Sequence, residues 1–361
     1  MLIHQTEPEL LTALLALADV DHLLTETAIR VPAVRVARDG SVLAESAFVR
    51  SGVTVAGKPL TGLVDPRKVL ALYDAGATVV LQALQRYWPP LTGLVSRLEL
   101  ELGHPCQANA YLTPPGSQGF AVHEDPHDVF VFQTHGTKLW EIHHADGDRL
   151  CDQHAGCRVD DVLMRPGVSM YLPTGTPHAA RAQDTASLHV TVGINQRTWS
   201  DLLRQVVEPL VEELATVHLP AGVLGSPDEL AAGLAERLEA FADAVRRVDT
   251  HDAVARDAER FLCSRNPRSS GGLLARSAAR ELTPESALRR RPGVPCVVRQ
   301  RGDRLLLLLG DRSLDVPAWL GPAVSELRPG AVLRPRDLPL TEESAVVLCR
   351  RLLREGLLEP A

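Results

Sequence analysis

Gly119-Phe120-Ala121-Val122-His123-Glu124-Asp125 ends in a His-x-Asp pattern. Successive side chains of an extended strand alternate between its two faces, so we expect His123 and Asp125 to point the same way and Glu124 the other way. An imidazole and a carboxylate on one face supply two of the three ligands of the 2-His-1-carboxylate site that holds non-haem Fe(II). The same pattern is also typical of a hydrogen-bonded pair in a turn, so it needs support from elsewhere in the chain.

Three further features of the chain give that support. His178 follows the turn Pro173-Thr174-Gly175-Thr176-Pro177 and is predicted to begin a strand, which makes it a candidate third ligand. Lys138 lies 15 residues after His123, on the return strand of a predicted hairpin. Asn109 and Tyr111 are spaced i and i+2 on the preceding strand, so they are expected to share a face.

The segment from Cys106 to about Ile194 contains short apolar stretches separated by Gly/Pro turns, which predicts a closed or sandwiched antiparallel barrel. Residues 149–161 are polar and are predicted to be a loop. Before the barrel, helices are predicted at 7–20, 65–73 and 91–102, with strands between 31 and 44 and at 78–81. After it, helices are predicted at 199–217, 226–248 and 251–262. A linker at 266–272, two hairpins around 302–303 and 310–311, and helices at 317–326 and 342–355 then predict a winged-helix-like module.

Length and composition limit the possible protein classes. A chain of 361 residues with 45% apolar and 23% charged residues is typical of a globular protein of two or three domains. It has no apolar run long enough to span a membrane and no signal-peptide pattern at its start, and its six cysteines are scattered. We therefore expect a cytoplasmic protein with reduced thiols.

Basic residues are unevenly distributed along the chain. From residue 261 onward, 17 arginines and 11 acidic residues give a net charge of +6, whereas the whole chain carries −7. A basic end could contact RNA or an acidic partner, but solvated arginines on helices produce the same pattern. Only three of the 38 basic residues are lysines, so the lysine at 138 carries more information than any single arginine.

The block from Asn109 to Asp125 resembles the signature of the JmjC-type ribosomal oxygenases, which are Fe(II)- and 2-oxoglutarate-dependent protein hydroxylases. The segments 131–140, 172–178 and 187–191 resemble later strands of that family. The resemblance implies a mainly β fold with α: a double-stranded β-helix (JmjC/cupin) barrel, a helical dimerisation region and a C-terminal winged-helix-like module. The corresponding domains are 1–198, an oxygenase domain with an N-terminal helical extension, then 199–265 and 266–361.

The resemblance also implies roles for individual residues. His123, Asp125 and His178 would bind Fe(II) as the catalytic centre, leaving positions for 2-oxoglutarate and dioxygen. Lys138 would pair with the distal carboxylate of 2-oxoglutarate, because a buried carboxylate without a charge partner is costly. Asn109, Tyr111 and, with less support, Ser187 would line the cosubstrate pocket. The helices after Trp199 would form a homodimer interface.

The predicted function is hydroxylation of an Arg or His side chain of a ribosomal protein. The same chemistry on a biosynthetic peptide or a small molecule is an alternative, and demethylation of N-methyl-lysine ranks below hydroxylation. A non-catalytic cupin-like binding protein is a further alternative, but it predicts damaged ligands, whereas His123, Asp125 and His178 are intact. We expect no membrane association, and nucleic-acid contact only indirectly through the ribosome; direct binding would be strongly salt-dependent.

Other candidate residues receive weaker interpretations. His127 is expected at the surface or behind the ligands, with substrate contact as the alternative. His189 shares a face with Ser187 and Thr191, and we expect it to be packed or hydrogen-bonded instead of a ligand. Cys151, His154 and Cys157 match no common zinc spacing. His143 and His144 end a strand and are expected to be exposed.

Overall fold

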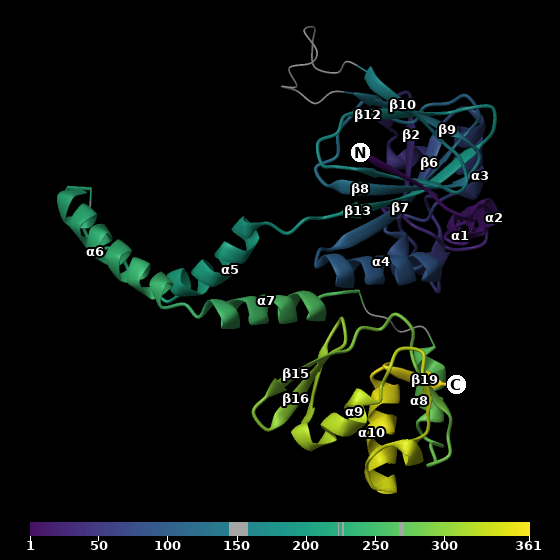
Figure 1. Ribbon diagram of the computed structural model, residues 1–361. Coiled ribbons are helices and arrows are strands. Elements are labelled where there is room, and N and C mark those ends of the chain that lie inside the picture. The colour runs from purple at the N-terminus through teal and green to yellow at the C-terminus, as the bar shows by residue number, and fades with distance from the viewer. Residues whose placement is uncertain (144–157, 223, 226, 267–270) are drawn as a thin grey trace. The chain divides into compact units, whose positions relative to one another are not determined.

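The computed structural model describes residues 1–143, 158–222, 224–225, 227–266 and 271–361. They form two compact units, Met1–Gln196 and Arg197–Ala361 (Figure 1). The predicted division into three domains at 198 and 265 stays a prediction. His144 and the weak zinc candidates Cys151, His154 and Cys157 lie outside the described residues.

The first unit contains two antiparallel sheets that supply the framework of the barrel. The larger sheet has the strand order β1-β11-β8-β13-β7-β6-β2-β3, and the smaller one has the order β10-β9-β12. The strands of the larger sheet, in that order, are Leu2–Gln5, Val168–Leu172, Asp128–His135, Ser187–Ile194, Cys106–Thr113, Thr78–Leu81, Val34–Arg38 and Ser41–Val42. Those of the smaller sheet are Arg158–Met164, Lys138–His143 and His178–Ala182. A separate short hairpin joins β4 (Thr54–Val55) to β5 (Lys58–Pro59).

Alternation along β13 separates the core from the inner face of the barrel. Every residue of this central strand is buried, and Leu188, Val190 and Val192 belong to the core on one side of the sheet. That core also contains residues of α2 (Leu17–Thr25), α3 (Pro66–Asp74) and α4 (Pro89–Leu102), and α4 contacts β7 directly. The intervening residues of β13 therefore face the other way, toward the smaller sheet.

The prediction of one continuous helix at 7–20 was wrong. The structure has α1 (Pro8–Thr12) and α2, separated by a break. The indole Nε1 of Trp88 donates to the carbonyl of Leu14 at 2.9 Å, and the Asp19 carboxylate accepts from the amide of Ala16 at 2.8 Å. These two contacts satisfy backbone groups that a continuous helix would pair internally, and the break lets Leu15 become wholly buried.

The loop predicted at 149–161 was also wrong at its end, because β10 begins at Arg158. Its polar start resembles a loop in composition, but Arg158 pairs with Glu141 of β9 at 3.2 Å, and Val162 and Met164 are buried. Other elements were not predicted, among them β1, which pairs with β11, and α8 (Gly272–Ala278).

The second unit begins with three helices, α5 (Trp199–Glu212), α6 (Pro227–Arg246) and α7 (Thr250–Cys263). The first of them is five residues shorter than the predicted 199–217. The rest has a core of its own, built by α8, α9 (Gly321–Ser325), α10 (Glu342–Arg354) and two three-stranded sheets. These sheets are β18-β14-β19 (Val332–Leu333, Leu288–Arg290, Leu358–Pro360) and β15-β16-β17 (Val297–Arg301, Arg304–Leu308, Ser313–Pro317). Both predicted hairpins are present, and short 3-10 turns lie at Glu45–Ala47, Leu84–Arg86, Ala318–Leu320 and Pro335–Asp337.

Across the described ranges, none of the helices combines the length and the apolar character needed to cross a bilayer.

The tight turn that joins β8 to β9 depends on Gly136. Its φ is +63°, and a Cβ at this position would lie 1.9 Å from the carbonyl oxygen of Ala186. Gly116 has almost the same φ, +68°, but a Cβ there would meet no atom within 4 Å. Alanine at Gly116 would therefore cost backbone strain alone, whereas alanine at Gly136 would add a steric clash with Ala186.

We expect Gly136→Ala to destabilise the first unit by about 3–4 kcal/mol, because a backbone carbonyl must move in addition to the strain of a left-handed alanine. The matched control Gly116→Ala should cost only about 1 kcal/mol. Urea unfolding, followed by circular dichroism, measures both. Equal shifts in the two variants would contradict the steric argument.

Candidate functional site

Backbone hydrogen bonds hold His123 and His178 opposite each other. The amide of His123 donates to the carbonyl of His178 at 3.0 Å, and the amide of His178 donates back at 2.8 Å. The two residues form an isolated antiparallel bridge between the loop before β8 and the first residue of β12. A third bond, from the amide of Gly175 to the carbonyl of Asp125 at 3.0 Å, ties the same loop to the turn before β12.

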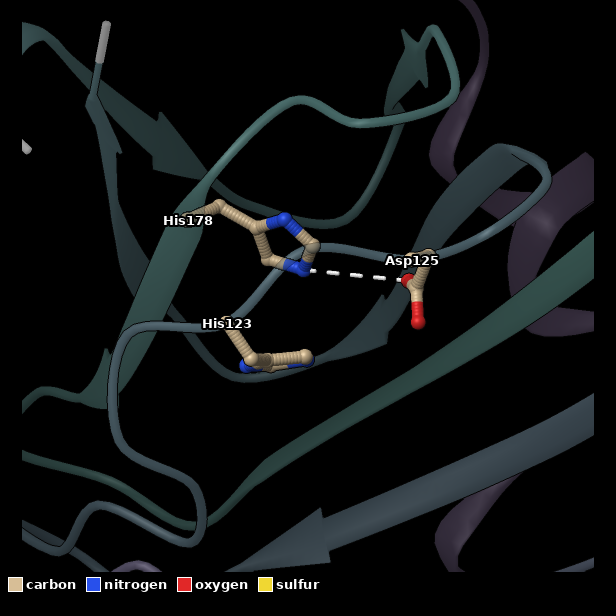
Figure 2. A group of neighbouring side chains, drawn as sticks. All are labelled: His123, Asp125 and His178. Carbon is tan, nitrogen blue, oxygen red and sulfur yellow. Dashed lines mark ion pairs between the residues drawn. The ribbon is translucent and has the colours of Figure 1, made fainter. Parts of the chain in front are cut away.

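The side chains of His123, Asp125 and His178 converge (Figure 2). Each offers one ligand atom, and these atoms all lie within 4.8 Å of one another. The Nε2 of His178 is 3.9 Å from a carboxylate oxygen of Asp125, and the two imidazole centroids are 4.5 Å apart. Two nitrogens and one oxygen at this spacing form a donor set suited to a divalent transition metal, and in the described part of the chain this is the one such group found.

Hydrogen bonds fix the orientation of both imidazoles. The Nδ1 of His123 lies 2.9 Å from the carbonyl of Ala121, and the Nδ1 of His178 lies 2.9 Å from the carbonyl of Thr176. A carbonyl can only accept, so each Nδ1 donates and each Nε2 keeps a free lone pair. Burial, together with the nearby His123, lowers the pKa of His178, which favours the neutral, metal-binding form.

The cluster opens into a cavity of about 350 Å³ lined by residues of both sheets. Its walls hold the three clustered residues, Lys138, Asn109 and Tyr111. They also hold Arg35, Thr78, Gln82, Gln107, Gly119, Phe120, His127, Val129, Trp140, Leu172, Ala180, His189, Thr191, Gly193 and Asn195. All of these residues belong to the first unit. The cavity therefore sits where the two sheets of the barrel face each other.

Lys138 brings a buried positive charge to this cavity. The residue is only 4% exposed, and its Nζ donates to the Thr113 hydroxyl at 3.0 Å. Among the described residues no carboxylate forms an ion pair with it. Burial lowers the pKa of this ammonium to about 7. An ammonium has three N–H donors, and the Thr113 hydroxyl accepts from one of them. A ligand carboxylate would supply further acceptors and the negative charge that balances the ammonium.

Asn109 and Tyr111 line the same cavity, as expected from their shared face. The amide oxygen of Asn109 accepts from the backbone of Ala83 at 3.0 Å and from Gln107 at 3.1 Å. The Tyr111 ring stacks on His189 with centroids 4.9 Å apart, and burial raises the pKa of its hydroxyl. Both side chains are thus held in place before any ligand binds.

Ser187 is not among the cavity-lining residues. It is fully buried two residues before His189 on the same face of β13, opposite Thr113 of β7. Its hydroxyl lies 2.9 Å from the amide nitrogen of Gln133 and accepts a hydrogen bond from it. The predicted contact of Ser187 with a cosubstrate stays a prediction.

Three histidines near the site occupy different environments. His189 is packed against Tyr111 and Trp140, as expected, and burial together with Lys138 and His178 holds its pKa well below the usual value. His127 lines the cavity and lies against Gly193, where a Cβ would come within 3.0 Å of its ring. His143, predicted to be exposed, is half-buried, and its amide donates to the carbonyl of Pro177 at 2.9 Å.

Several cavity residues were missed in the sequence. Thr113 lies outside the cavity lining but accepts a hydrogen bond from Lys138, and it continues the i, i+2 series from Tyr111, so the strand period could have identified it. Arg35 and Gln82 lie on or beside strands far from the His-x-Asp segment. No local signal links them to the site, because their approach depends on the order of β2, β6 and β7 in the sheet.

Known proteins match the same region of the chain. Residues 93–202 match the family model described as JmjC domain. Ribosomal oxygenase 1 of Rattus norvegicus is 34% identical over 162 residues, which cover 42% of this chain and 27% of that protein. The bifunctional lysine-specific demethylase and histidyl-hydroxylase NO66 of Branchiostoma floridae is 38% identical over 148 residues, covering 40% of this chain and 22% of its own. This chain thus matches about a quarter of the length of these curated relatives.

Solved structures extend the likeness in fold. The ribosomal oxygenase YcfD of Escherichia coli aligns with 96% of this chain and 91% of its own, at a TM-score of 0.52 and 18% identity. A structure of YcfD in complex with cobalt and 2-oxoglutarate has a TM-score of 0.54 at 18% identity, over 96% of this chain and 90% of its own. The mixed β and α architecture is therefore the JmjC/cupin type. Residues 93–202 of this chain are thus similar to the JmjC domain, and relatives that match this region are named ribosomal oxygenases.

Proposed function

We propose that the chain is an Fe(II)- and 2-oxoglutarate-dependent oxygenase. The observation that carries the proposal is the convergence of His123, Asp125 and His178 in a cavity that also holds the buried cation of Lys138. A metal-ligand cluster alone would suit many reactions. A cluster that shares its cavity with a buried ammonium, which has no carboxylate partner among the described residues, suits a metal cofactor together with an anionic cosubstrate.

In this proposal each residue has a defined task. His123, Asp125 and His178 hold Fe(II), with the imidazoles oriented by the carbonyls of Ala121 and Thr176. Lys138 pairs with the distal carboxylate of 2-oxoglutarate. When bound, the iron, 2-oxoglutarate and dioxygen would together hydroxylate a C–H bond, with 2-oxoglutarate converted to succinate and CO₂.

The remaining walls position ligands and exclude water. Asn109 and Tyr111 would line the cosubstrate pocket. Their side chains are already fixed by Ala83, Gln107 and His189, so little conformational freedom is lost on binding. Ser187 would support the pocket from outside its lining, where its hydroxyl accepts a hydrogen bond from the buried Gln133.

We propose a ribosomal protein as the substrate, oxidised at an Arg or His side chain in the cytoplasm. The support is the naming of relatives as ribosomal oxygenases and, for one, as a histidyl-hydroxylase. A biosynthetic peptide or a small molecule is the alternative. Mass spectrometry of ribosomal proteins after incubation with the enzyme would separate these, because only the first predicts one added oxygen on a ribosomal protein.

We further propose that α5 and α6 form a homodimer interface. Neither helix has a buried residue among those described, although both carry apolar side chains. Trp199 is 79% exposed, and Leu203, Leu234 and Leu238 are each more than half exposed. Apolar surface of this extent is typical of association sites.

The β-hairpins and helices from 271 onward form their own core, which supports a winged-helix-like protein-interaction module.

Replacing one cluster residue tests the oxygenase proposal directly. We expect His123→Ala to reduce conversion of 2-oxoglutarate to succinate by roughly 100-fold or more, since even the loss of a ligand's hydrogen-bond partner typically costs 10–100-fold. Turnover with Fe(II) under air, with and without ribosomal proteins, is the measurement. The control is Glu124→Ala, an exposed neighbour outside the cluster and the cavity lining. A native chain that neither binds Fe(II) nor consumes 2-oxoglutarate would refute the proposal.

The buried ammonium predicts a pH dependence of cosubstrate binding. Its pKa in the free protein is about 7, so it is charged below pH 7 and mostly neutral above. Binding of a carboxylate requires the charged form, so the affinity for 2-oxoglutarate should fall up to about tenfold per pH unit above pH 7.

Calorimetric titration of 2-oxoglutarate between pH 7 and 9, with Mn(II) in place of Fe(II), checks this dependence. Lys138→Met should bind weakly and without this slope. The exposed Lys68, which donates to the carbonyl of Val49, provides the matched control Lys68→Met, which should keep both affinity and slope. A native slope equal to that of Lys138→Met would contradict the assigned role.

The dimer proposal predicts a native mass in solution twice the chain mass of 39.1 kDa. Leu203→Glu combined with Leu234→Glu should give monomers, because charges would then lie on the apolar faces of α5 and α6. Leu273→Glu, at a 79% exposed position on α8, is the control and should remain dimeric. Light scattering after size-exclusion chromatography measures all three; a monomeric native chain would rule the interface out.

A further inference from the structure

Arg35 is a second cation of the cavity, on a different wall from Lys138. It lies on β2 and is half-buried. Its guanidinium carbon is 5.9 Å from the centroid of the Phe120 ring, and that ring lies 5.8 Å from the ring of His123. The arginine charge also reaches Tyr111, where it opposes the effect of burial on the hydroxyl pKa. Arg35 is therefore close to the metal-ligand cluster, although it is far from it in sequence.

This guanidinium has no anionic partner in the described ranges. No ion pair or side-chain hydrogen bond involves Arg35 there, and its Nε is buried without an acceptor. By contrast, Arg38 on the same strand lies 3.6 Å from the carboxylate of Asp39. Leaving a buried donor unsatisfied costs about 1–3 kcal/mol, so an acceptor supplied by a ligand is expected.

The neighbouring wall cannot neutralise Arg35. Gln82, Gln107 and Asn109 contribute uncharged amides to the cavity, and they are already engaged with backbone groups or with each other. Of the described residues, Asp125 is the one carboxylate that lines the cavity, and it belongs to the ligand cluster. The nearby Asp128 is not in the lining, and its oxygens accept hydrogen bonds from Tyr171, Thr174 and Gln196.

Charge balance extends this argument to the loaded site and rests on the proposed function. A divalent metal and the ammonium of Lys138 carry the positive charges, and Asp125 with the two carboxylates of 2-oxoglutarate carries as many negative ones. These charges cancel. The guanidinium of Arg35 is then the charge left over, in a partly buried cavity where charges interact more strongly than in water.

We propose that Arg35 is the specificity residue of the substrate subsite and that the site takes an acidic peptide segment. A carboxylate on the substrate segment pairs with the guanidinium and removes the excess charge. A cationic side chain would instead bring a second positive group beside Arg35. Of the two proposed target residues, a neutral His is therefore favoured over Arg, and an acidic residue beside the target would pair with Arg35.

Peptides that differ only by Asp against Asn, or Glu against Gln, isolate the effect of a carboxylate charge on binding. The probes are capped pentapeptides Gly-Gly-X-Gly-Gly with X as Asp, Asn, Glu, Gln or Arg. Their binding to the full-length protein is measured by saturation-transfer NMR, first without metal and then with Mn(II) and 2-oxoglutarate. We expect the Asp or the Glu peptide to bind on the order of tenfold more tightly than its amide counterpart, and the Arg peptide to bind most weakly.

Variants assign the preference to one side chain. Arg35→Gln should abolish the difference between acid and amide peptides, and Arg35→Lys should retain much of it because the charge remains. Arg38→Gln, on the same strand but outside this cavity, should behave like the native chain. Circular dichroism and thermal unfolding confirm that each variant is folded before its binding is compared.

The outcomes separate this inference from the oxygenase proposal. If acid and amide peptides bind the native chain equally, if neither acidic peptide binds, or if the Arg peptide binds best, the role of Arg35 is overturned. The same holds if Arg35→Gln keeps the native preference. A native chain that binds neither Fe(II) nor 2-oxoglutarate would instead refute the proposed function. Peptide binding measured without metal would still test the role of Arg35.

Discussion

The pair of backbone hydrogen bonds between His123 and His178 is the constraint on which the candidate site depends. It joins a loop before β8 to the first residue of β12, so it ties together segments that lead into different sheets. Without it the two imidazoles would sit on independently moving segments, and their spacing would not be fixed. Because the contact is made by the main chain, the side chains remain available to bind a ligand. The bond from Gly175 to the carbonyl of Asp125 extends the same arrangement to the third member of the cluster.

The barrel interior places two cations, Lys138 and Arg35, close to few anions, and both have an energetic cost in the free protein. The ammonium has a hydroxyl acceptor, whereas the Nε of the guanidinium has no acceptor within the described chain. A fold stabilised by its apolar core tolerates such groups because their cost is small compared with the total burial of β13 and the helices packed behind it. Ligands with carboxylates would recover that cost, so the same groups that weaken the free protein would favour the loaded one.

The sequence predicted the features of the site that are local to one strand or turn. The alternation of Asn109 and Tyr111, the turn before His178 and the hairpin that carries Lys138 are all present, because strand period and turn chemistry are short-range properties. It failed where tertiary contacts decide. The break in the first predicted helix depends on Trp88, which is distant in sequence, and the start of β10 depends on pairing with β9. A polar segment such as Arg158 to Asp161 forms a strand only because a partner strand is already beside it.

Ser187 and Arg35 show the limit of arguments from strand period. Period two correctly places Ser187 on the inner face of β13, but it does not say how far along the strand the cavity extends, and the hydroxyl contacts Gln133 instead. Arg35 shows the same limit: strand alternation places it on the opposite face from Arg38, three residues later, but does not say which face borders the cavity. One arginine faces the cavity and the other pairs with Asp39, because β2 is the third strand from β13 and its inner face continues the wall formed by β6 and β7. Which arginine joins the site is therefore decided by sheet order, a property of the whole unit.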